Sequence, residues 1–216
     1  MNKEEIEACD EETMIMPSAA FGPATPIISV RNNIYFYDEV NTTVTRALIS
    51  AMYEMALDMA NSSITNGYNP TPINLHINSY GGNVSDALAI VQCIKNIQNG
   101  EITKVGNIKI PIEVNTYIEG EADSAGSLIA CVGTKRYMSK YSLSLVHEVR
   151  QIGGSGGKAE DIDIQAQNLA KFRDIFKEIY LEHSKMTPEQ YDKLIEKENY
   201  STPKELLELG LIDEII

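Results

Sequence analysis

The chain is poor in the residues that hold disulfides and most metals. It has no tryptophan, three cysteines and three histidines among 216 residues. Cys9, Cys93 and Cys131 are an odd number without C-x-x-C spacing, so neither a disulfide framework nor a metal site is expected. Long apolar runs are also missing, and the first twelve residues (MNKEEIEACDEE) lack the basic and apolar regions of a signal peptide. These absences favour a cytoplasmic protein that makes no use of a membrane.

Basic residues are scarce as well. Eighteen Lys and Arg stand against 31 Asp and Glu, which gives a formal net charge of −13. Such a balance argues against nucleic acid or an anionic membrane surface as the main partner. The hydrophobic content of 43% suffices for one compact domain of this length.

The pattern along the chain predicts an α/β fold. Residues 1–26 are acidic, then rich in Met, Pro and Ala without a period, and we expect a mobile N-terminal arm followed by one domain over 27–216. A strand followed by a Gly-containing turn and a helix occurs twice, which predicts crossover connections and a largely parallel sheet. The expected strands are 27–36, 73–78, 112–118, 136–138 and 143–146, and the expected helices are 42–59, 84–97, one from Ala125 and 160–183, with turns over 61–72 and at Gly120. Two short helices should begin after Thr187 and Thr202, because each precedes a first-turn proline and a capping-box partner.

The second of these strand–turn–helix units carries a candidate nucleophile. Within residues 115–127 (NTYIEGEADSAGS), Ser124 lies between the strand and a small-residue helix that begins at Ala125. A hydroxyl at such an elbow is exposed, and the free N–H groups of the new helix favour developing negative charge. A serine at a helix start is also a common N-cap, so the pattern alone leaves both interpretations open.

Two further features at strand ends complete a possible serine hydrolase. Gly81 and Gly82 follow one strand, where glycines let the backbone approach a ligand closely or form a tight turn. Among the histidines, His76 points off the middle of a strand and suits a packed or surface position. His183 ends a helix, where a positive charge suits the dipole. Only His147 terminates a strand next to a loop, so it is the candidate base.

A glycine-rich run over 153–158 (GGSGGK) invites a nucleotide-binding interpretation. It is not a Walker loop, since Ile152 replaces the first glycine and Ala159 replaces Ser or Thr. It matches a loose dinucleotide fingerprint, but no second strand and acidic residue follow at the required distance. We expect a flexible hairpin loop and no cofactor.

These motifs together resemble the Clp protease proteolytic subunit family (ClpP, the S14 serine peptidases), over about residues 27–216. The segments that carry the resemblance are INSYGGNVSDALAI, GEADSAGS, RYMSKYSLSLVHEV, GGSGGKAEDIDIQAQNL and ELLELGLIDEII. The resemblance implies a ClpP/crotonase-like spiral of ββα units with a projecting handle helix at about 159–184. It also implies a homo-oligomer of heptameric rings, possibly a tetradecamer, that cleaves unfolded polypeptides in its chamber and works with an AAA+ ATPase unfoldase.

The resemblance also assigns roles to residues. Ser124 is similar to the nucleophile and His147 to the base, with the N–H groups of Gly82 and Ala125 as the oxyanion hole. Glu198 stands where the family has an aspartate; its neighbour Asn199, or no functional acid at all, are the alternatives. Gly81, Gly82, Gly153 and Gly154 would contact the peptide.

Several residues depart from the family pattern and keep other functions open. Tyr80 replaces a proline, Glu119 and Asp123 place charges near the elbow, and Glu148-Val149 replaces Gln-Pro. Asp123 either opposes an alkoxide by like-charge repulsion or points to solvent. The alternatives are a phage-type head-maturation protease, an inactive ring or scaffold subunit, and a crotonase-type acyl-CoA enzyme.

Overall fold

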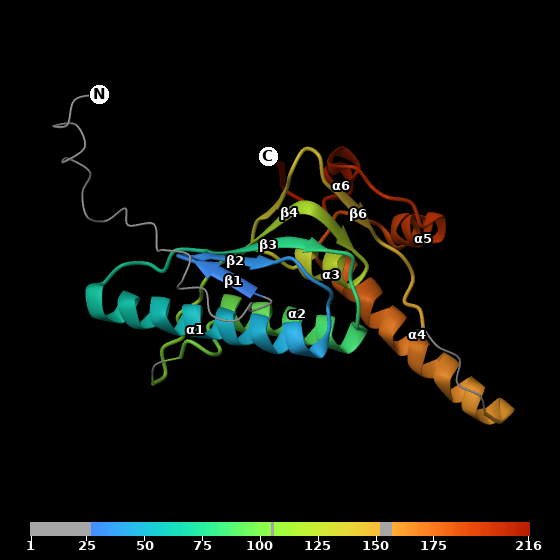
Figure 1. Ribbon diagram of the computed structural model, residues 1–216, viewed down its shortest axis with the longest axis horizontal. Coiled ribbons are helices and arrows are strands. Elements are labelled where there is room, and N and C mark those ends of the chain that lie inside the picture. Colours follow the sequence, from blue (N-terminus) through green and yellow to red (C-terminus); the bar gives the residue numbers. More distant parts are fainter. Residues whose placement is uncertain (1–26, 105, 152–156) are drawn as a thin grey trace.

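The computed structural model describes residues 27–104, 106–151 and 157–216 (Figure 1). The expected arm over 1–26 and the glycines Gly153 and Gly154 lie outside the described residues. No helix within those ranges is long and apolar enough to cross a membrane. The elements are β1 Ile27–Val30, β2 Asn33–Phe36, α1 Thr42–Asn66, β3 Ile73–Ser79, α2 Val84–Gln98, β4 Val114–Asp123, α3 Ala125–Cys131, β5 Arg136–Met138, β6 Leu143–Leu145, α4 Ala159–Glu182, α5 Pro188–Lys197, α6 Pro203–Leu209 and β7 Glu214–Ile215.

The strands form one mixed sheet in the order β1-β2-β3-β4-β5-β7, and β6 pairs with the far end of β4. Only β1 and β2 pair antiparallel; the other pairs are parallel. The predicted α/β class with a largely parallel sheet is therefore confirmed. Because β4 pairs with β3, β5 and β6, its end lies at the centre of the sheet, where three other segments can reach it.

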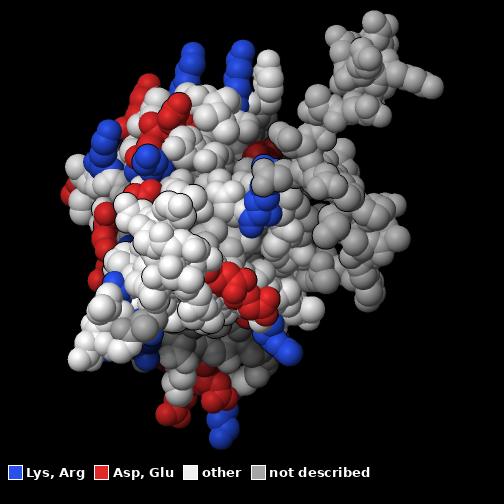
Figure 2. Space-filling model, turned by 90° about the vertical axis from the view of Figure 1, so that its left-hand side faces the viewer, with Lys and Arg blue, Asp and Glu red and all other residues white. Residues whose placement is uncertain are grey.

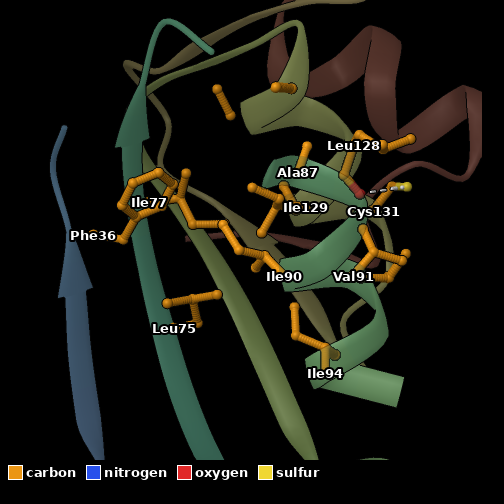
Figure 3. Close-up of a cluster of buried hydrophobic side chains, with 14 of the residues drawn as sticks. Phe36, Leu75, Ile77, Ala87, Ile90, Val91, Ile94, Leu128, Ile129 and Cys131 are labelled. Atoms are coloured by element: carbon orange, nitrogen blue, oxygen red, sulfur yellow. Dashed lines mark hydrogen bonds between the residues drawn. The ribbon is translucent and has the colours of Figure 1, made fainter. Parts of the chain in front are cut away.

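The core lies between this sheet and the helices α1, α2 and α3, which run along one of its faces (Figure 1). Leu75 and Ile77 alternate along β3 on the buried face, and Ile90 and Ile94 of α2, at helical spacing, belong to the same buried cluster (Figure 3). Each of these side chains is fully buried, and burying one contributes roughly 1.5–3 kcal/mol. This packing fixes the ends of β3 and β4, and with them the candidate site.

Helix α1 is longer than predicted, because the expected turn over 61–72 begins only after Asn66. Ala60 is buried, and Thr65 Oγ1 donates to the Asn61 carbonyl at 2.9 Å. Polar groups at the end of the helix therefore find hydrogen-bond partners within the helix. Propagating an existing helix costs little even through residues of low propensity. Gly67 ends it in the left-handed region at φ 72°.

Strand β4 also runs further than predicted, since no turn forms at Gly120. The chain stays extended to Asp123, and a β-bulge opposite Ile77–Ser79 absorbs the extra length. Asn78 fills the space that a Gly120 side chain would take: a Cβ there would lie 2.4 Å from Asn78 Oδ1. That oxygen accepts the Glu121 N–H at 3.0 Å. The change of direction therefore comes at Ser124 itself.

Helix α4 extends away from the rest of the molecule (Figure 1). Only its C-terminal part is anchored, by the buried Phe176 and Tyr180. Towards its N-terminus Ile162 and Ile164 are 54% and 49% exposed. This is the long helix that the sequence predicted over 160–183.

Charged side chains of both signs are interspersed on the side of the molecule shown in Figure 2, around an uncharged area.

The opposite face of the sheet from α1 and α2 carries a row of stacked rings across four strands. Tyr35, His76, Tyr117 and Tyr137 follow one another at 4.6–4.7 Å between ring centroids. Each pair is in cross-strand register, so the row is set by strand pairing.

Candidate active site

Ser124 lies at the elbow between β4 and α3 in a strained backbone conformation. Its φ of 54° and ψ of −119° lie outside the regions that L-residues favour. Its N–H donates to the Leu145 carbonyl at 2.7 Å, and its own carbonyl accepts the Leu128 N–H at 3.2 Å. Ser124 occupies the N-cap position of α3, but its side chain makes no capping hydrogen bond. The hydroxyl is held at the elbow without a structural role there.

The Gly81-Gly82 turn packs directly against this elbow. Gly81 and Gly82 have φ of 97° and 146°, which favours glycine at both positions. A Cβ on Gly81 would lie 2.8 Å from the Cβ of Ser124 and 3.1 Å from the N of Ala125. The absence of a side chain at Gly81 is therefore what lets the two turns meet.

Two N–H groups near Ser124 lack partners within the described residues. Gly82 forms a parallel bridge with Val40, in which the Asn83 N–H and the Gly81 carbonyl make the bonds. That pairing turns the N–H of Gly82 to the other side. The Ala125 N–H is free because it opens helix α3. Both groups are neutral donors of the kind that stabilise an oxyanion.

His147 follows β6 and is half-buried. β6 pairs in parallel with the end of β4, with Leu145 opposite Asp123, so two residues later the chain passes the elbow. The Nδ1 of His147 lies 2.6 Å from the Glu148 carbonyl, which can only accept, so Nδ1 carries the proton. With the proton on Nδ1, Nε2 is the nitrogen that is left to act as a base.

Glu198 pairs with Arg150 in the structure. It ends α5 in the left-handed region at φ 48°, and its carboxylate forms an ion pair with the Arg150 guanidinium. Glu198 and Glu148 line one cavity of about 690 Å³ between α4 and α5, whereas Asn199 lines a different one between α5 and α6. An antiparallel bridge pairs Ser144 with Ser201. That bridge is isolated and does not extend to Glu198, which lies in the left-handed region at the end of α5.

Asp123, next to the nucleophile, is buried and does not point to solvent. Burial, followed by the nearby Glu121 carboxylate, raises the pKa of Asp123 to about 6; hydrogen bonds from the Leu145 N–H and Tyr200 oppose this. Its Oδ1 has no partner within the described residues. Of the two expectations for Asp123, exposure is wrong.

The raised pKa predicts that Asp123 lowers stability at neutral and alkaline pH. The protonated form contributes stability that is complete below the unfolded pKa of 3.8 and lost as pH rises through about 6. Asp123→Asn should therefore raise the free energy of unfolding by about 2–3 kcal/mol at pH 8 and change it little at pH 4. Denaturant titrations of both proteins at the two pH values measure this. Equal gains at both would contradict it.

Glu119 and the two other histidines, His76 and His183, form hydrogen bonds with groups outside the elbow. The Glu119 carboxylate binds His76 Nδ1 at 2.7 Å and the Tyr37 hydroxyl, on the open face of the sheet. His183 Nδ1 donates to the Ile179 carbonyl at 2.8 Å, and Lys95 Nζ donates to its Nε2. Burial and then Lys95 lower the pKa of His183, which opposes the favourable charge expected at that helix end.

A groove adjoins the Gly82 N–H. Its cavity of about 520 Å³ is bounded by the Gly82 turn, by residues 149–151 and by α4, with Val84, Leu169 and Phe172 as its apolar part. Within the described residues no group of three His, Cys, Asp or Glu is placed to hold a metal ion.

Two polar residues in this region were not predicted from the sequence. Ser127 of α3 and Tyr180 of α4 are buried, and their oxygens lie 2.5 Å apart beside the Ser124 carbonyl. Tyr180 stands on the apolar stripe of a helix, and Ser127 in a run of small residues. Neither position carried a signal in the sequence, because the partners are 53 residues apart.

Ser124 lies in a strained conformation at a strand-to-helix elbow of a mixed sheet, and a glycine turn packs against it. These features define a class of α/β proteins that present a side chain at the end of a central strand. The family model for Clp protease matches residues 26–216, and the chain belongs to this family. The fold, with six helices and a mixed sheet in the described residues, agrees with the ClpP/crotonase fold expected from the sequence.

Proposed function

We propose that the protein is a serine endopeptidase that hydrolyses peptide bonds in unfolded polypeptides. The observation that carries this proposal is the strained Ser124, whose side chain makes no capping hydrogen bond and which lies where the Gly81-Gly82 turn packs against the start of α3. Membership of the Clp protease family supports the same chemistry. By that relationship we also propose assembly into heptameric rings, possibly a tetradecamer, with an AAA+ ATPase as a separate unfoldase.

The proposed reaction has two steps. His147 Nε2 takes the proton of Ser124 Oγ as that oxygen attacks the substrate carbonyl, and the N–H groups of Gly82 and Ala125 bind the oxyanion. The imidazolium then gives its proton to the leaving amine, which leaves an acyl-enzyme. A water molecule, deprotonated by His147, attacks the ester and releases the acid and free Ser124. The peptide would lie as an added strand beside Gly82, which lines the groove.

A fluorophosphonate probe tests this function directly. It should form a covalent adduct that peptide mapping places on Ser124, and peptide hydrolysis should fall in proportion to labelling. A folded protein without any adduct would favour the alternative of an inactive ring or scaffold subunit. Copurification with an AAA+ ATPase, as opposed to a capsid protein, separates the cellular protease from a head-maturation protease.

We further propose Glu198 as the residue that stabilises the His147 imidazolium, supported by the cavity that Glu198 shares with Glu148, the chain neighbour of His147. The Glu148 carbonyl already orients Nδ1, so Glu198 would contribute charge rather than tautomer selection. Glu198→Ala should therefore lower kcat only about tenfold, less than in triads where the acid fixes the tautomer.

A matched control for this prediction is Glu196→Ala. Glu196 lines the same cavity but makes no ion pair within the described residues. It should keep wild-type kcat. Equal kcat for Glu198→Ala and the wild type would remove Glu198 from the mechanism.

A further inference from the structure

The Ser124 carbonyl is the acceptor of several donors at once. The Leu128 N–H donates to it at 3.2 Å and the Ser127 hydroxyl at 2.8 Å, and the Tyr180 hydroxyl lies 3.5 Å away. Ser127 Oγ lies 2.8 Å from the Ser124 carbonyl and 3.4 Å from the Leu145 carbonyl, so we place its proton on the nearer one. With that proton used, the Ser127 oxygen accepts the Tyr180 proton at 2.5 Å. Tyr180 O–H, Ser127 O–H and the Ser124 carbonyl thus form one chain of hydrogen bonds.

The carbonyl of Ser124 and the N–H of Ala125 belong to the same peptide unit. In a trans peptide the N–H points opposite to the carbonyl, so fixing the oxygen on the α4 side aims the N–H away from it. Hydrogen bonds to the oxygen also polarise the amide and strengthen its N–H as a donor. The chain from α4 therefore acts on the group that lines the site.

The Tyr180 hydroxyl is well placed to act as a permanent donor. It is fully buried, and burial raises its pKa well above the ordinary value, so it keeps its proton. Its ring packs on Tyr191 of α5 at 5.7 Å between centroids, which fixes the ring in position.

We propose that Tyr180 and Ser127 are positioning residues that aim and polarise the Ala125 N–H for oxyanion binding. This inference rests on the proposed function, because it needs an oxyanion to form beside Ser124. Neither residue touches the substrate. Their effect would be on acylation of Ser124 and not on how peptides bind.

Tyr180→Phe removes one oxygen and keeps the packed ring. The rate constant for fluorophosphonate labelling of the folded protein should fall about fivefold, and kcat with it, while KM stays unchanged. Ser127→Ala should lower labelling about tenfold. The double variant should be no slower than Ser127→Ala, because the two hydroxyls act in series.

Tyr191→Phe is the matched control, since the Tyr191 hydroxyl donates to no group within the described residues. It should label at the wild-type rate. Labelling of Tyr180→Phe at the wild-type rate, or equal losses in both tyrosine variants, would overturn the inference while leaving the hydrolase proposal intact. A wild type that cannot be labelled would instead refute the proposed function itself.

Discussion

Ser124→Ala is expected to lower peptide hydrolysis by about 10⁴-fold or more, because no other group can form the acyl-enzyme. The same change should leave stability almost unaltered. The Ser124 side chain makes no capping bond, and the strained φ of 54° is retained by alanine. Initial rates with a fluorogenic peptide and thermal unfolding of the same preparations measure the two effects.

A nearby hydroxyl provides the control for this variant. Ser85 lines the groove beside Gly82 and is exposed. Ser85→Ala should hydrolyse peptides within about twofold of wild type, as surface changes outside the reacting groups do. If Ser124→Ala kept its activity and Ser85→Ala lost it, the nucleophile would have been assigned to the wrong turn.

The parts of the fold that could be predicted are those set by local pattern. Alternation in β3 and helical spacing in α2 marked elements that the structure places within one residue of the expected bounds. The glycine pair and the elbow serine could be found because each is a sequence-local turn. Periodicity does not show where a helix stops when the polar groups at its end bond within the helix, which is why the sequence predicts a turn at residues 61–66 of α1.

The parts of the site that could not be predicted depend on tertiary partners. Gly120 looked like a turn, but its missing side chain makes room for Asn78 on the neighbouring strand. Exposure was one of two expectations for Asp123, but β6 and Tyr200 cover it. Glu198 is next to Arg150 only after α5 packs against α4. In each case the residue type indicated that the position is unusual, but the residue that contacts it is distant in the sequence and could not be predicted.

Gly82→Ala should lower kcat by about 10²–10³-fold, the loss expected when one oxyanion donor is displaced. A Cβ at this position would lie 2.3 Å from the Val40 carbonyl oxygen, and φ of 146° is unfavourable for any other residue. The backbone of the turn must therefore shift, and the N–H moves with it. Steady-state kinetics on the folded variant should show the loss mainly in kcat.

Strain must be separated from displacement of the donor, and Gly67 allows this. Gly67 also has a positive φ, of 72°, but a Cβ there meets no atom within 4 Å, and it lies at the end of α1. Gly67→Ala should lower the free energy of unfolding by about 1 kcal/mol and leave kcat at the wild-type value. Because both variants carry backbone strain, a loss of kcat confined to Gly82→Ala would trace it to the displaced N–H. A Gly82→Ala protein with wild-type kcat would mean that the oxyanion is bound by other groups.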